Sequence, residues 1–356
     1  MTKTDLGAER EELRKALILL KPYHQLSPKR FFTDLTATGL VAWGSLWAMS
    51  VLNMGPVFWL LFLTAYLAFF RGNAFIHEVV HFHKKIPGLG ACYNLFFGFP
   101  NRIPYYMHEP HRFHHLPNTF GTNRDPEYLF LKGKGMGYFF LPFLAAPLSP
   151  LLLTARFGLW PLFSWLTPRT WQNFVYQRAS TIVVNPSYVR NEPSEEERKE
   201  ALWQDLGCAS VFLLFIVLGV TGVLSAKFFV LWYVIATLNG VVNIYRARVA
   251  HLYDNEEGSL SPMAALRDSV TIEGSFLSEL WAPLGLKYHS LHHLAPSIPY
   301  HNLAKAHHHL KSHLDRNHPY SQTILPSFRE GILQYQRLVR RQRAPREQTN
   351  QTNLLS

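Results

Sequence analysis

Four apolar stretches, arranged as two closely spaced pairs, limit the fold of this chain more than any other feature. They cover residues 35–52, 56–70, 208–224 and 228–244. Each comes close to the ~20 helical residues that cross the hydrocarbon core of a bilayer, although the second is slightly short. The turn within the first pair is uncharged, and Lys227 is the only charge in the turn of the second. We therefore predict an all-α integral membrane protein with two transmembrane hairpins, about four spanning helices in total.

Composition and charge agree with this prediction. Of the 356 residues, 48% are hydrophobic and 17% are charged. The mean hydropathy of −0.03 indicates a few spanning helices combined with a large polar portion. The formal net charge of +11 could indicate nucleic-acid binding, but the apolar segments favour positive-inside topology and anionic headgroups instead. We expect no nucleic-acid partner.

Basic residues set the predicted orientation. Arg30 and Arg71 flank the first pair, and Arg246 follows the second, so the outer ends of both pairs and both termini are expected in the cytoplasm. In a bacterium this would be the inner membrane. Residues 1–30 have no short apolar core with a cleavage site, so we expect no signal peptide. With only Cys92 and Cys208, the sequence predicts no disulfide framework.

The chain divides into three predicted regions. Residues 1–34 are expected to form an amphipathic cytoplasmic lead-in, with Leu17–Leu20 on the membrane surface. Residues 35–310 form the membrane domain, and residues 311–356 a basic, partly disordered tail. Residues 138–166 are apolar but contain four prolines and Arg156. We expect short interfacial or re-entrant helices there, with a further hairpin as the alternative.

Histidine clusters follow the apolar pairs. Positions i, i+3 and i+4 share one helix face, so each cluster can direct its imidazoles at one point. His251 stands alone after the fourth apolar stretch. The predicted topology places all of them on the cytoplasmic side. The eight clustered residues are His77, His81, His111, His114, His115, His289, His292 and His293.

The number of histidines favours two metal ions. Imidazole suits zinc, copper, iron and nickel. The first cluster alone matches the H-E-x-x-H of zinc proteases, with Glu78 as general base, but one zinc needs only three protein ligands. Two irons that activate O2 would explain nine imidazoles, and their chemistry is the oxidation of an unactivated C–H bond. A metal transporter would place histidines inside the apolar stretches, which contain none.

The pattern resembles the membrane fatty-acid desaturase/hydroxylase superfamily. His289 to His293, followed by Pro299-Tyr300, is similar to the third histidine box of that superfamily. His111 to His115, followed by Asn118 and Asp125-Pro126, is similar to the second. The resemblance covers roughly residues 35–310. It implies two iron ions bound by the eight box histidines, with His251 as a ninth ligand. Some relatives add an Asn ligand where this chain has Ala247, so that ligand is not expected.

Several residues near the clusters are expected to support the ligands. Metal-bound histidines commonly donate their second N–H to a carboxylate, so Glu78 and Asp125 are candidates, and His301 is a further one. Asp125-Pro126 can also be interpreted as a helix start. His83 and His108 lie off the ligand spacing and are expected behind the site or at the surface. The run His307–His309 resembles a metal-binding tract, but we expect a solvated or interfacial helix.

The resulting functional prediction is an O2-dependent di-iron oxidase of an acyl chain, most simply a fatty-acid desaturase. Oxidative decarboxylation of a free fatty acid, or hydroxylation of an acyl chain or carotenoid, could use the same site. A membrane zinc protease is the remote alternative. The chain has no flavin or nicotinamide fingerprint, so an external electron donor such as an acidic ferredoxin is expected at its basic surface.

Overall fold

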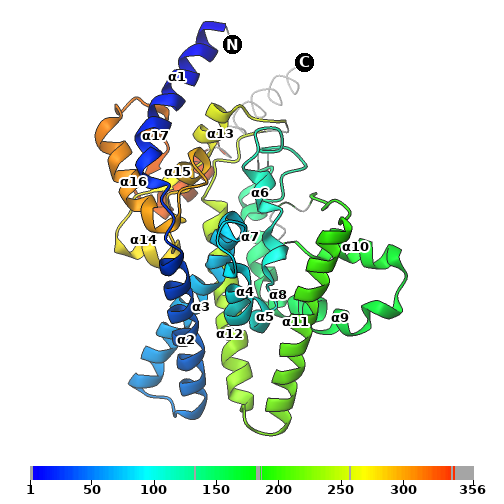
Figure 1. Ribbon diagram of the computed structural model, residues 1–356. Helices are drawn as coiled ribbons and strands as arrows, with labels where there is room; N and C mark the ends of the chain where they lie inside the picture. Colours follow the sequence, from blue (N-terminus) through cyan, green and yellow to red (C-terminus); the bar gives the residue numbers. More distant parts are fainter. Residues whose placement is uncertain are drawn as a thin grey trace, which may run out of the picture. The chain divides into compact units, whose positions relative to one another are not determined.

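The computed structural model describes residues 3–131, 134–181, 185, 187–255, 258–337 and 340, and their regular structure is almost entirely helical (Figure 1). The strands among these residues are β1 (Thr271–Ile272) and β2 (Ile324–Leu325), which pair in parallel. The all-α prediction is confirmed. The end of the predicted tail, residues 341–356, lies outside the described residues. The chain forms two units, which are described separately.

Unit 2 comprises Leu26–Arg112 and Ala145–Asn243 and contains both predicted hairpins. Helix α2 (Pro28–Val51) packs along α3 (Pro56–Phe82), and α11 (Glu195–Val220) leads through a short turn into α12 (Ala226–Arg248). A proline occupies the first turn of α2 and of α3, where its missing N–H costs no hydrogen bond. Helix α11 begins with a capping box between Ser194 and Glu197.

Within the described part of the chain, four helical segments are long and apolar enough to cross a membrane: α3, residues Met136–Leu166, α11 and α12. Three of them contain predicted spans. The predicted span 35–52 lies in α2, which is not among the four; its first turns carry Lys29, Arg30 and Asp34. Residues Met136–Leu166 meet the criterion instead. A membrane protein with four such helices is therefore confirmed, although one of the four is a different segment from the one predicted.

The breaks expected between short helices over residues 138–166 are absent, because the helical run is continuous, whereas its interfacial or re-entrant placement stays a prediction. Pro147, Pro150 and Pro161 each lie in the first two positions of a new segment, where the run changes between α, 3-10 and π turns; only Pro142 lies inside a helix. Such changes of helix type accommodate prolines without ending the helix. The segments are α7 (Met136–Ala145), η4 (Ala146–Leu148), α8 (Ser149–Leu153), η5 (Thr154–Leu159), α9 (Trp160–Phe163) and η6 (Ser164–Leu166).

Arg156, the one charge in this run, is neutralised inside unit 2. Its Nη1 lies 3.0 Å from Oδ2 of Asp205 in α11, and both side chains are largely buried. The guanidinium also donates to the hydroxyls of Tyr106 and Ser180. A charge in an apolar helix needs such partners, and here they tie η5 to α11 and to η3 (Tyr105–His108).

The other unit 2 elements are short. They are α4 (Leu89–Tyr93), η2 (Asn94–Gly98), α5 (Phe99–Asn101) and α10 (Arg169–Ala179). Helix α6 (His111–His114) crosses from unit 2 into unit 1 along the chain.

Unit 1 comprises Met1–Gln25, Phe113–Leu144 and Ile244–Ser356. Its α1 (Lys3–Leu20) packs on α16 (Tyr300–His313) and α13 (Pro262–Asp268), so Ala16 and Leu20 lie in a buried apolar core. The expectation that Leu20 contacts the membrane surface is therefore wrong, while Leu17 and Ile18 are exposed. The remaining elements are η1 (Lys21–Tyr23), α14 (Phe276–Trp281), α15 (His289–Leu294) and α17 (Pro319–Gln322).

Candidate metal centre

Four predicted ligands of unit 1 form one cluster, with all but His293 buried: His114, His251, His289 and His293. His114 ends α6, and His289 and His293 share one face of α15. The Nε2 atom of His251 lies 3.1 Å from that of His114 and 2.8 Å from that of His289. The Nε2 atoms of His289 and His293 are 3.1 Å apart. The four rings therefore direct their Nε2 atoms at one point.

His251 reaches this point because of the strand-like segment that carries it. The backbone N–H of Leu252 donates to the carbonyl of Asp268, and that of Val270 donates to the carbonyl of Ala250. His251 thus pairs antiparallel with Ser269. Tyr253 then adopts a left-handed φ of 56°, which is unusual for a bulky residue and turns the chain away. Such conformations concentrate at functional sites, where the surrounding structure maintains them.

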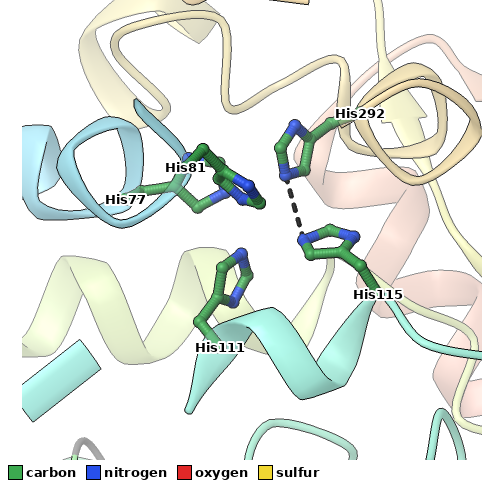
Figure 2. Close-up of side chains that lie close together, drawn as sticks. All are labelled: His77, His81, His111, His115 and His292. Carbon is green, nitrogen blue, oxygen red and sulfur yellow. Dashed lines mark hydrogen bonds between the residues drawn. The ribbon is translucent and has the colours of Figure 1, made fainter. Parts of the chain in front are cut away.

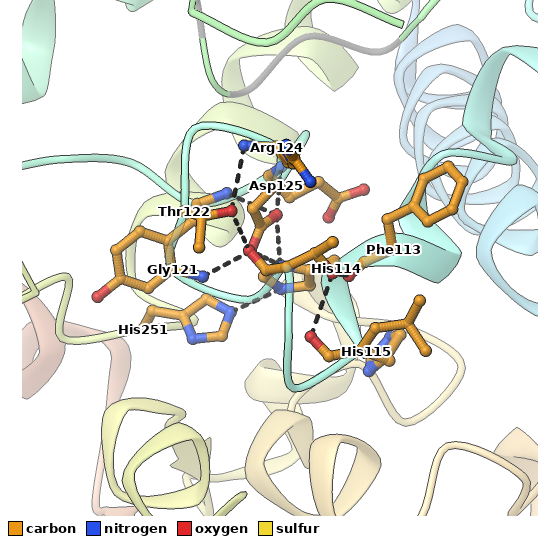
Figure 3. A network of polar contacts seen from close by, with 12 residues as sticks. Phe113, His114, His115, Gly121, Thr122, Arg124, Asp125 and His251 are labelled. Carbon is orange, nitrogen blue, oxygen red and sulfur yellow. Dashed lines mark hydrogen bonds and ion pairs between the residues drawn. The ribbon is translucent and has the colours of Figure 1, made fainter. Parts of the chain in front are cut away.

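Two buried carboxylates fix the proton positions on these imidazoles. Both oxygens of Asp125 lie within 2.9 Å of Nδ1 of His114 (Figure 3). Oδ2 of Asp268 lies 3.3 Å from Nδ1 of His251. A carboxylate only accepts, so Nδ1 carries the proton in both rings and each Nε2 presents a lone pair. Asp125 is itself oriented by the backbone N–H groups of Gly121, Glu127 and Tyr128.

The cluster fits a metal ion. The Nε2 atoms of the four imidazoles converge at separations of 2.8–3.1 Å, and with the protons on Nδ1 a cation bound among them would accept their lone pairs. Two ligands at right angles, each ~2.1 Å from a metal, would be ~3.0 Å apart, close to the separations observed between these Nε2 atoms. Phe120 covers the cluster, with its ring 5.1–5.4 Å from those of His114, His251 and His293.

Burial keeps most of these imidazoles neutral, the form that binds metals. It lowers the pKa of His289 and His293 well below the usual histidine range, and neighbouring imidazoles lower it further. Burial also lowers the pKa of His251. At His114 burial again acts to lower the pKa, but the Asp125 carboxylate outweighs it and the net shift is upward.

A second pair of predicted ligands lies beside this cluster in unit 1. The Nε2 atoms of His115 and His292 are 3.1 Å apart (Figure 2). The His115 ring also lies 4.6 Å from that of His293. Burial lowers the pKa of His292 to about 3, so this imidazole is neutral at physiological pH.

The three predicted ligands of unit 2 form a trio. His77 and His81 lie one turn apart near the end of α3, which confirms that the first cluster continues the helix of the second apolar stretch. Their ring centroids are 4.9 Å apart, and those of His77 and His111 are 4.7 Å apart (Figure 2). Glu78 is buried, with Oε1 3.3 Å from Nδ1 of His77, a placement suited to the supporting role predicted for it.

Other histidines have different surroundings. His83 lies 3.5 Å from Glu109, and the His108 ring stacks on that of His111 at 4.7 Å. His301 starts α16, with its ring 5.1 Å from that of Tyr300, and it is outside the four-histidine cluster. The expectation of a solvated helix for His307–His309 is wrong at His307, which is fully buried with Nδ1 2.7 Å from the Tyr320 hydroxyl.

Sequence reasoning missed Asp268. It considered carboxylates near the histidines in sequence, whereas Asp268 is 17 residues beyond His251, at the end of α13. Only the antiparallel pairing of 250–252 with 268–270 brings the two together. Glu279 lies near the third histidine cluster in the sequence, but its carboxylate forms an ion pair with Lys287 at 2.6 Å instead of supporting a histidine.

Comparison with known proteins identifies the chain's family. The fatty acid desaturase family matches residues 54–324, which includes every predicted ligand. The chain is also 33% identical to a ceramide hydroxylase of Caulobacter vibrioides over 356 residues, covering 96% of this chain and 97% of that protein. The buried histidine clusters are the groups that could hold the metal on which this family depends. The chain therefore belongs to the fatty acid desaturase family and is a membrane oxidoreductase that modifies lipids.

Proposed function

We propose that this protein is an O2-dependent di-iron hydroxylase of a ceramide or a closely similar long-chain lipid. The observation that carries the substrate and reaction is the similarity to a ceramide hydroxylase along nearly the whole of both chains. The histidine cluster supports the metal, because its donors are all nitrogen and two of its imidazoles are oriented by carboxylates.

In this proposal His114, His251, His289 and His293 hold one iron ion. The other iron ion has His77, His81 and His111 as ligands, and His115 and His292 are the further ligands that the family resemblance implies. Two irons would together supply O2 activation and the oxidation of an unactivated C–H bond. The chain's own contribution is to keep His251, His289 and His293 neutral by burial, to orient the Nδ1–H groups of His114 and His251 with the Asp125 and Asp268 carboxylates, and to exclude water with Phe120.

Desaturation is the second candidate function, favoured by the description of the matching family. The two reactions remove hydrogen from the same kind of carbon and differ in whether oxygen is retained. Both need an external electron donor, and an acidic ferredoxin-like protein fits the net charge of +11. We propose that donor, active site and both termini are on the cytoplasmic side, as the flanking arginines favour.

The deciding experiment uses the full-length protein in lipid vesicles, with ceramide, a reduced ferredoxin and O2 labelled with heavy oxygen. Hydroxylation predicts a product that gains one labelled oxygen atom, detected by mass spectrometry. A product that loses two hydrogens without label would support desaturation instead. Free fatty acid should be tested in parallel, because release of CO2 with a shortened alkene would indicate decarboxylation. His289→Ala is the inactive control.

A further inference from the structure

An exposed aromatic surface in unit 2 has no role in the site described above. Helix α10 places Trp171, Phe174 and Arg178 on one face, at the i, i+3, i+7 spacing. Trp171 is 59% exposed and Phe174 54% exposed, and their rings pack edge to face at 5.9 Å. Phe163, Trp165 and Leu166, directly before α10, are also exposed. Together these six residues form what we call the aromatic platform.

The platform is held rigidly from behind. Tyr176, on the opposite face of α10, is buried and stacks on Tyr106 with the ring centroids 6.3 Å apart and the planes 4° apart. The Arg190 guanidinium lies 4.3 Å from the centre of the Tyr176 ring. The Gln172 side chain donates to the carbonyls of Ser164 and Thr167. Because these contacts fix the orientation of α10, its aromatic face is exposed in a fixed orientation.

The neighbours of the aromatic platform along the chain indicate that a membrane covers it. The helical run Met136–Leu166 ends in the platform, and α11 follows α10 along the chain; both are long and apolar enough to cross a membrane. Tryptophan concentrates where spanning helices leave the hydrocarbon core. Arg178 is exposed and forms no ion pair within the described part of the chain, so its charge suits a lipid phosphate. A soluble surface would rarely expose so many large apolar side chains within one short segment.

We propose that the aromatic platform lies in the plane of the membrane interface, with Trp171 and Phe174 inserted among the lipid chains and Arg178 bound to an anionic headgroup. The alternative occupant is a second copy of this chain. The proposal is independent of the reaction catalysed.

The test attaches an environment-sensitive fluorophore to the full-length protein in vesicles, in a background with Cys92 and Cys208 replaced by alanine. Single cysteines are placed at Trp171→Cys or Phe174→Cys, with Glu196→Cys as control, since Glu196 is exposed on the first turn of α11. At 171 and 174 we expect a blue-shifted emission that lipids with brominated chains quench and aqueous iodide does not. The control should show the reverse.

Two outcomes would overturn the proposal. In the first, iodide quenches the fluorophore at positions 171 and 174 as strongly as it quenches the fluorophore at position 196. In the second, the emission is blue-shifted, but brominated lipid does not quench it and the shift disappears when the protein is diluted with excess lipid. That result would mean that a second copy of the chain covers the platform. The headgroup contact is tested separately with the label at 174. Anionic lipid should shift its emission further, and Arg178→Gln should abolish that increment without changing the response in neutral lipid.

Discussion

At the scale of single residues, the two aspartates behind the cluster are the most specific part of the site. Asp125 holds the Nδ1 proton of His114, and we predict that Asp125→Asn weakens metal binding. An asparagine amide cannot replace both carboxylate oxygens, and loss of such a support typically costs about 10–100-fold in affinity. Iron titration of the purified protein measures this. Glu279→Gln, which removes an ion pair with Lys287 in the same unit, should leave the affinity unchanged.

Asp268 provides a second, independent test of the same principle. It faces Nδ1 of His251 and also accepts a hydrogen bond from the Tyr128 hydroxyl at 3.0 Å. Asp268→Asn should therefore lower iron affinity to a similar extent as Asp125→Asn, with a thermal unfolding midpoint close to that of the parent protein. An unchanged iron affinity in both variants would show that these carboxylates only support the fold.

His307 gives a prediction for the dependence of stability on pH. Burial lowers its pKa to about 4, below the usual histidine value of 6.5. As pH falls between about 6.5 and about 4, the unfolded chain binds a proton there that the folded chain does not, so stability decreases. Thermal unfolding between these pH values should show a smaller decrease for His307→Gln than for the parent protein. Equal slopes would contradict the lowered pKa.

At the scale of elements, sequence reasoning succeeded where one local rule decides the outcome. It predicted the second hairpin and the continuation of α3 through His77 and His81, because length and hydropathy define a spanning helix. It failed over residues 138–166, where prolines suggested breaks that changes of helix type absorb. The exposed aromatic face of α10 was not predicted, because it depends on which side of the helix packs against Tyr106. Asp268 was not predicted as a partner of His251, because a strand-like pairing that sequence spacing does not indicate brings the two residues together.

The Arg156–Asp205 pair yields a prediction about helix packing. Arg156→Leu would leave Asp205 buried without its cation, a change that typically costs about 3–5 kcal/mol. The double variant Arg156→Leu/Asp205→Leu should recover most of that loss. Thermal unfolding in detergent gives the comparison. Arg169→Gln, which breaks the exposed pair with Glu195, is the matched control and should cost about 0–1 kcal/mol. A double variant less stable than the single one would contradict this interpretation.

At the scale of the whole molecule, the number and identity of the metals distinguish the proposed enzyme from its remote rival. In the proposal, His289 of unit 1 and His77 of unit 2 are ligands of different iron ions. An intramembrane zinc protease would instead use His77, Glu78 and His81, and His289 would have no part in it. The two hypotheses therefore predict different metal contents for the same pair of variants.

We predict two irons per chain in the parent protein and a loss of about one iron in either His289→Ala or His77→Ala, because each removes a ligand from one ion only. The double variant should lose both. Elemental analysis of purified protein gives the counts, and Mössbauer spectra would report the two sites without requiring activity. His313→Ala, which removes an exposed histidine of α16, is the control. One zinc without iron, unaffected by His289→Ala, would overturn the di-iron assignment in favour of the protease.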